Sequence, residues 1–155
     1  MDGLPMRPFE ESLPMALLAA RETMMRAFRP MLAEHDLTEQ QWRVLRALTA
    51  SDEPMEVAPL AERTSLLAPS VSRILANLEQ RSLIERRTAS HDQRRALISL
   101  TAAGVQLVRR IAPHSEDTYA LIEAQFGAAR LTNLLAELHD LSALEIGAGK
   151  MEKAS

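Results

Sequence analysis

The sequence predicts a mostly α-helical protein with a small β-wing: a winged helix-turn-helix flanked by N- and C-terminal dimerisation helices. Three observations predict this class: an aliphatic composition, an amphipathic helix followed by an arginine-rich hairpin, and apolar stripes at both chain ends. The 155 residues are 46% hydrophobic but only 3% aromatic, which favours helices packed by aliphatic side chains. A chain of this length need hold only one domain.

The chain is predicted to begin with an irregular arm over residues 1–11 and a first dimerisation helix over about 12–34. Pro14 is tolerated in the first turn of that helix, whereas Pro30 should kink it or end its regular part. Thr38 and Gln41 then have the spacing of a capping box, which opens a second helix ending near Ala50.

The winged helix-turn-helix is expected over about 38–101. A short helix over 57–64 and a turn over 65–68 lead to a helix with Pro69 at its first position. That helix has an apolar stripe formed by Val71, Ile74, Leu75 and Leu78. The other face carries Ser70, Ser72, Arg73, Asn77 and Arg81. Short polar and cationic side chains suit the floor of a DNA major groove, although a solvated surface helix is the alternative.

An arginine-rich hairpin follows this helix. Strands over 84–88 and 96–100 flank a polar turn over 89–93. The arginines of the hairpin are Arg86, Arg87, Arg94 and Arg95. Such an arm fits the electronegative minor groove of DNA, and the alternative is an exposed hairpin that charge keeps soluble.

The distribution of charge favours the DNA interpretation. Residues 57–101 hold seven arginines and four acidic residues, a net charge of +3, within a chain whose net charge is −3. A basic module inside an acidic protein is typical of a specific polyanion-binding surface.

The C-terminal part is predicted to hold the other dimerisation helices, over about 101–144, and a flexible tail over 145–155. Thr101 caps a long helix, Pro113 should bend it and Gly127 can close it before a last helix over about 129–144. The apolar stripes at both chain ends exceed what one monomer needs. We therefore expect a homodimer, which places two recognition helices one DNA turn apart on a palindromic operator.

Several classes of function are disfavoured by what the sequence lacks. Without cysteine there is no disulfide and no thiolate metal site, and no apolar run approaches the length that spans a bilayer. No nucleophile elbow, P-loop or glycine-rich fingerprint is visible, so we expect no enzyme activity and no cofactor. We also expect no metal site, because a surface histidine is favoured over a weak site at His114 beside Glu116 and Asp117. A cytoplasmic protein is the default expectation.

The order of these elements resembles the MarR family of bacterial transcription regulators. The wing segment, Asp92-Gln-Arg94-Arg95 followed by Leu100-Thr101-Ala-Ala-Gly104, is similar to the family's D-x-R…LT-x-x-G signature, and SVSRILANLEQRSLIERR resembles its recognition helix and first wing strand. The resemblance covers about 12–144 and implies one MarR-like domain there.

The resemblance also implies roles for individual residues. It implies that Ser70, Ser72 and Arg73 face the major groove, that Arg94 enters the minor groove and that Asp92 orients it. The apolar turn Leu66-Leu67-Ala68 departs from the family, where many members carry a Ser or Thr cap. Within the family, LTEQQWRVLRAL and ARETMMRAFRPML look like the repressors of homoprotocatechuate (4-hydroxyphenylacetate) catabolism.

The second helix also suggests a sensory pocket. An indole beside guanidinium groups suits an aromatic carboxylate, by stacking for the ring and bidentate bonding for the carboxylate. The expected ligand-binding residues are Arg21, from the same or the other subunit, with His35, Trp42 and Arg46. Core packing of Trp42 and simple exposure of Arg46 are the alternatives.

The function expected from the sequence is therefore a dimeric, ligand-responsive DNA-binding regulator, a repressor of an aromatic-acid catabolism operon. The alternative is a helical adaptor that uses the same surface for protein contacts, without sequence-specific DNA binding.

Overall fold

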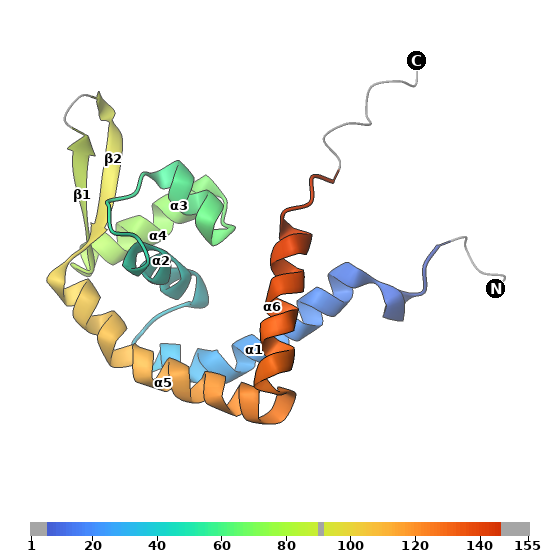
Figure 1. The fold of residues 1–155 in the computed structure, drawn as a ribbon. Helices are drawn as coiled ribbons and strands as arrows, with labels where there is room; N and C mark the ends of the chain where they lie inside the picture. Colours follow the sequence, from blue (N-terminus) through green and yellow to red (C-terminus); the bar gives the residue numbers. More distant parts are fainter. Residues whose placement is uncertain (1–5, 90–91, 147–155) are drawn as a thin grey trace, which may run out of the picture. The chain divides into compact units, whose positions relative to one another are not determined.

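The structure, a computed structural model, describes residues 6–89 and 92–146, with only the backbone described at residues 89 and 92–94. The order of the elements is η1 (Phe9–Glu11), α1 (Leu13–Ala33), α2 (Glu39–Thr49), α3 (Val57–Thr64), α4 (Ala68–Gln80), β1 (Ile84–Ala89), β2 (Asp92–Leu100), α5 (Ala102–Phe126) and α6 (Ala128–Ser142) (Figure 1). The predicted fold class, helical with a small two-stranded wing, is confirmed.

The chain divides into two compact units, Met1–Ser115 and Glu116–Ser155, and the division falls within α5. The first unit holds α1 to α4, the wing and the first half of α5. The second holds the rest of α5 and α6. The predicted tail over 145–155 lies mostly outside the described residues, as do residues 1–5 of the predicted arm.

The core of the first unit joins every element of the predicted winged helix-turn-helix. Fully buried side chains come from α2 (Leu45), α3 (Leu60), α4 (Leu75), β2 (Ile98) and α5 (Ile111). These side chains recur at helical or alternating spacing, so each element turns one apolar side inward. Leu60 and Ala61 are the apolar residues that α3 turns inward.

Two predicted caps fix the ends of helices that hold this module. Thr38 Oγ1 accepts a hydrogen bond from Gln41 N at 3.1 Å, and Gln41 Oε1 accepts one from Thr38 N at 2.9 Å. The capping box at the start of α2 is therefore confirmed. At the start of α5, Thr101 Oγ1 accepts from Gly104 N at 3.1 Å and donates to the carbonyl of Ser82 at 2.7 Å.

Pro30 is expected to kink α1 or to end its regular part, and the structure contradicts only the second alternative; Pro69 is expected at the first helical position of α4, which needs correction. The regular helix α1 does not end at Pro30 but continues to Ala33. Proline removes only its own donor, and the next turn closes normally, since Glu34 N donates to the Pro30 carbonyl at 3.2 Å. In α4 the first helical residue is Ala68 and Pro69 is the second, a position that also needs no intrahelical donor.

The wing is longer than predicted, since its strands reach Ala89 and begin again at Asp92. The register is regular from Ile84 paired with Leu100 to Thr88 paired with Ala96, and then jumps to Ala89 paired with Asp92. Residues 93–95 therefore bulge from the ladder, and a bulge redirects the side chains that it contains. The alternation of apolar and polar residues did not reveal the true length of the turn, because the bulge places residues 93–95 within β2 without partners in the ladder.

Candidate nucleic-acid interface

The recognition helix α4 is oriented by its buried side. Val71, Leu75 and Leu78 are buried, and successive helical residues are rotated by about 100°. Arg73 therefore lies nearly opposite these three side chains and is exposed. Packing against α2, α3 and β1 thus decides which polar side chains α4 presents outward.

The outward side of α4 brings together the predicted groove-reading residues. Ser72, Arg73 and Asn77 are exposed, and Ser70 is half-buried. A groove of 380 Å³ runs between the start of α2 and this side of α4. It is lined by Thr38, Gln40, Gln41, Leu66, Ser70, Arg73, Ile74 and Asn77.

Gln41 joins the cap of α2 to the recognition helix. Its Oε1 accepts from the Thr38 backbone, and its Nε2 donates to Asn77 Oδ1 at 2.8 Å. One amide side chain therefore caps a helix and holds another side chain of the groove. The sequence indicated only the cap, because the partner lies 36 residues away.

Arg86 and Arg87 of the wing are engaged in ion pairs. Arg86 Nε lies 3.1 Å from Glu79 Oε2 of α4, and Arg87 Nη2 lies 2.9 Å from Glu85 Oε1. Arg87 remains the more accessible of the two, with 74% of its side chain exposed against 28% for Arg86. Arg86 therefore links the wing to the recognition helix, whereas the side chain of Arg87 remains accessible to a DNA phosphate.

Arg95 lies in the bulged part of β2, next to the outer end of the regular ladder, and is held there by Glu56. Its Nε donates to Glu56 Oε2 at 3.1 Å and its Nη2 pairs with Glu56 Oε1, a two-pronged contact with the residue before α3. Met55, the residue before Glu56, forms a bridge with Ile98 of β2, with hydrogen bonds of 2.9 and 2.8 Å. Arg95 braces the wing against α3, a partner that the sequence did not indicate.

Two expected contacts of the wing tip cannot be placed through their side chains. The backbone of Asp92 and Arg94 belongs to β2, and their side chains lie outside the described part of the structure.

The expected ligand-binding residues lie around α1 and α2. Arg46 Cζ is 5.9 Å from the centroid of the half-buried Trp42 ring, one helical turn along α2. This is a cation–π arrangement, with Arg46 exposed. His35 is half-buried, and its backbone carbonyl accepts a hydrogen bond from Arg81 Nη2 at 3.2 Å.

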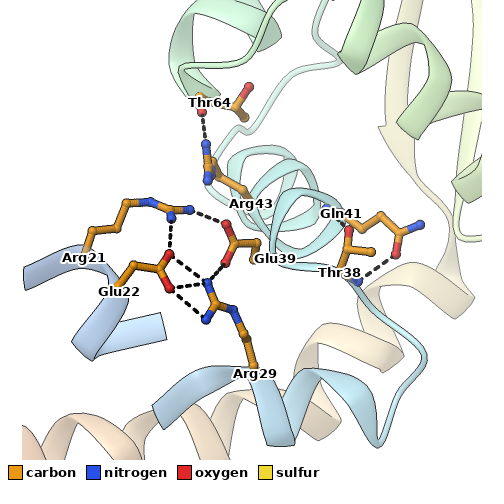
Figure 2. A network of polar contacts seen from close by, with 8 residues as sticks. All are labelled: Arg21, Glu22, Arg29, Thr38, Glu39, Gln41, Arg43 and Thr64. Atoms are coloured by element: carbon orange, nitrogen blue, oxygen red, sulfur yellow. Dashed lines mark hydrogen bonds and ion pairs between the residues drawn. The ribbon is translucent and has the colours of Figure 1, made fainter. Parts of the chain in front are cut away.

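Arg21 belongs to a four-residue charge network that sequence reasoning missed (Figure 2). Arg21 on α1 pairs with Glu39, the first residue of α2, within the same chain, and donates to Glu22 Oε1 at 3.3 Å. Arg29 donates to Glu22 at 3.0–3.1 Å and to Glu39 Oε2 at 3.3 Å. Helical spacing on α1 could have indicated the pairing of Glu22 with Arg29, but not that of either arginine with Glu39.

The network changes the acidity of its members. The hydrogen bond from Arg29 lowers the pKa of Glu22 below its ordinary value of 4.5, and that from Arg21 does the same to the pKa of Glu39. The hydrogen bond to Glu22 raises the pKa of Arg29. The carboxyl groups of Glu22 and Glu39 are therefore ionised at neutral pH, and the network links α1 to the start of α2.

Arg43 lies close to this network and makes a separate contact. Its Nη1 donates to the Thr64 carbonyl at 3.0 Å, which ties α2 to the end of α3 (Figure 2). Thr64 is buried and donates to the Leu60 carbonyl at 2.6 Å. The helix that carries Trp42 is thus linked on one side to α1 and on the other to the helix-turn-helix.

Other kinds of site find no support in the described residues. Among residues 6–89 and 92–146, no group of three or more histidine, cysteine or acidic side chains could hold a metal ion. In the same part of the chain, no helix is long and apolar enough to cross a membrane.

The fold and the site define the class of protein: a winged helix-turn-helix DNA-binding protein. Comparison with known proteins gives the same class. The sequence pattern of the MarR family matches residues 35–95. The chain is 42% identical over 134 residues to the homoprotocatechuate degradative operon repressor of Escherichia coli, covering 86% of this chain and 90% of that protein.

Two solved structures are similar in fold. NadR in complex with 4-hydroxyphenylacetate has a TM-score of 0.80 at 34% identity, covering 92% of this chain and 100% of the NadR chain. The transcriptional repressor CouR bound to a 23-mer DNA duplex has a TM-score of 0.79 at 25% identity, covering 91% and 99%. The protein belongs to the MarR family, and it is a DNA-binding transcriptional regulator rather than an enzyme.

Proposed function

We propose that this regulator is a homodimeric repressor of an aromatic-acid catabolism operon, and that an aromatic carboxylate releases it from its operator in the cytoplasm. The observation that carries the proposal is the pair Trp42 and Arg46 on α2, a ring beside a guanidinium group, within a helix tied both to α1 and to the helix-turn-helix. The relative that represses homoprotocatechuate degradation and the NadR complex with 4-hydroxyphenylacetate support the same ligand class.

On DNA, Ser70, Ser72 and Arg73 read the major groove, and Arg94 with its neighbour Asp92 serves the minor groove. The exposed outward side of α4 supports the first placement, and the wing that follows supports the second. Arg73→Ala should weaken operator binding by about 1–3 kcal/mol and relax the base preference at one position per half-site.

The matched control is Arg63→Ala on α3, which removes the same charge from an arginine that donates to the Ala50 carbonyl. It should leave the base preference unchanged. If Arg73→Ala and Arg94→Ala both bind the selected operator as the unmodified protein does, the placement is wrong.

The dimer is supported by apolar side chains exposed in each unit. In α1, Leu13 is 51% and Leu18 is 50% exposed, and in the second unit Leu121 is 63% and Leu135 is 47% exposed. None of the residues of α6 is buried within the chain, although the helix carries a stripe of leucines. Burial of such side chains is the main driving force for association.

Sedimentation of the full chain at micromolar concentration tests this assembly. Removal of residues 129–155 should give monomer or aggregate. A monomeric full-length protein at that concentration would rule the dimer out, and with it the proposed palindromic operator.

The ligand acts by preferring one of two arrangements. In the complex, the carboxylate of the ligand pairs with Arg46 and its aromatic ring stacks on Trp42. Binding therefore alters the contacts of α2, the helix whose first residue, Glu39, pairs with Arg21. Because α2 is tied to α1 by Arg21 and to α3 by Arg43, the spacing of the recognition helices can respond. Only a ligand that binds the non-operator arrangement more tightly lowers operator affinity, commonly by 5- to 150-fold, or about 1–3 kcal/mol.

Titration of the protein–operator complex with 4-hydroxyphenylacetate and related aromatic acids tests this step. Trp42→Phe and Arg46→Ala should reduce the response, while Arg26→Ala on α1, a control for charge, should retain it. No response to any aromatic acid at millimolar concentration, or a full response in both α2 variants, would refute the pocket assignment.

The competing function is a helical adaptor that binds proteins through the same surface. The salt dependence of duplex binding separates the two, because neutralised phosphates release counterions and make log Kd vary steeply with log salt. The similarity to the DNA-bound repressor favours the first function.

A further inference from the structure

An exposed leucine stands at the start of the recognition helix. Leu67 is the N-cap residue of α4, in an extended conformation with φ −71° and ψ 139°, and 77% of it is accessible. A leucine side chain has no oxygen to accept the free N–H groups of the first turn, where serine, threonine, aspartate or asparagine is preferred. Leucine is therefore unfavourable for the folded state at this position for two reasons: it does not cap the helix, and it exposes apolar surface to water.

The position of Leu67 explains what such a residue can contact. In helix-turn-helix proteins the N-terminal end of the recognition helix approaches the base edges. Leu67 precedes the groove residues Ser70 and Arg73 by three and six positions, so it lies at the leading end of α4. The following residues Ala68 and Pro69 are exposed as well, which makes the whole tip apolar.

We propose that Leu67 reads the C5-methyl group of a thymine in the major groove of the operator. Of the base edges in that groove, thymine alone presents an apolar group, whereas the others present only hydrogen-bond donors and acceptors that leucine cannot satisfy. The proposal rests on the DNA-binding function above, and it adds a specificity-determining residue to the polar readers Ser70, Ser72 and Arg73.

Replacement of thymine by deoxyuridine tests the contact, because uracil lacks only the methyl group. The probe is a duplex that the purified full-length protein selects from genomic DNA, with each thymine of a half-site replaced in turn. At one thymine in each half-site, a single replacement should weaken binding by about fourfold, the factor expected for burial of one methyl-sized group. Replacement at both symmetric positions should weaken it by about fifteenfold.

Variants of Leu67 make the assignment specific. Leu67→Ala should reduce the effect of deoxyuridine at that thymine to less than twofold, while Leu67→Met, which keeps an apolar side chain of similar size, should preserve it. Leu67→Asn supplies the missing cap, so it should raise the melting temperature and still abolish the effect. A gain in stability together with a loss of base reading is not expected of a residue with a merely structural role.

Two outcomes overturn the proposal. In the first, every duplex with a deoxyuridine replacement binds the protein as tightly as the thymine duplex does. In the second, a deoxyuridine replacement weakens binding, but Leu67→Ala and Leu67→Asn show the same weakening as the unmodified protein. Failure of the DNA-binding function would look different, since the protein would then select no duplex at all.

Discussion

Replacement of Gly104 by alanine should destabilise this protein, although alanine is the better helix former. Gly104 is buried in the first turn of α5, and a Cβ at this position would lie 2.1 Å from the Leu83 carbonyl oxygen and 3.2 Å from Leu100 Cδ2. Cβ atoms essentially never approach other atoms closer than 3.0 Å, so the backbone of Leu83 or of α5 must move. Leu83 is poorly able to yield, because its carbonyl accepts from Thr101 N at 3.1 Å and its N–H donates to Leu78 at 2.9 Å.

The magnitude follows from two opposing effects. Alanine favours the helix by about 1 kcal/mol over glycine. Overpacking against a backbone atom costs about 3 kcal/mol, the upper end of the usual range. The net loss of about 2 kcal/mol would lower the ratio of folded to unfolded protein by about 30-fold.

Urea unfolding of the full chain, followed by circular dichroism at one protein concentration, measures this loss. Ala103→Gly, at the exposed neighbouring position, is the control and should cost about 1 kcal/mol through helix propensity alone. Because Gly104 lies where α5 meets the base of the wing, Gly104→Ala should also weaken duplex binding. A Gly104→Ala protein as stable as the parent, or more stable, would refute the reasoning.

Three further predictions concern the caps and ion pairs of the module. Thr38→Ala should lower the free energy of unfolding by about 1 kcal/mol in urea titrations, and Thr38→Ser should not, since serine keeps the capping oxygen. Glu39→Gln should lower the free energy of unfolding at pH 7 by about 1–2 kcal/mol, since it breaks charged hydrogen bonds. The pKa of Glu39 is lowered in the folded state, so the stabilisation by Glu39 is present above the ordinary value of 4.5 and is lost as the pH falls through the folded-state pKa. The difference in stability between Glu39→Gln and the parent should therefore vanish in acid. A difference that does not change with pH would contradict the network. Glu56→Gln should weaken duplex binding in a fluorescence anisotropy titration, as Arg95→Ala does, because both changes release the wing from α3. If the only effect were the loss of an acidic charge near DNA, Glu56→Gln would bind the duplex more tightly. Tighter binding would therefore show that the pair has no positioning role.

Local sequence determined much of the helical framework. Thr38 and Gln41 predicted the start of α2, and Val71, Leu75 and Leu78 predicted both α4 and its inward side, because these signals depend on residues within one or two turns of each other. The wing and its arginines were visible for a similar reason, since a hairpin pairs neighbouring segments. Even the exposed Leu67 could be recognised as a poor cap from its identity alone.

The tertiary structure decided which polar side chains are available. Arg86, Arg87 and Arg95 look alike in the sequence, yet each has a different acidic partner, and for Arg95 that partner is 39 residues away. Gln41 reaches Asn77 across 36 residues, and Arg21 reaches Glu39 across 18. Periodicity cannot encode such pairings, because they depend on how α1, α2, α4 and the wing pack. The burial of one apolar side of each element determines which long side chains meet, and therefore which of them remain free to contact DNA.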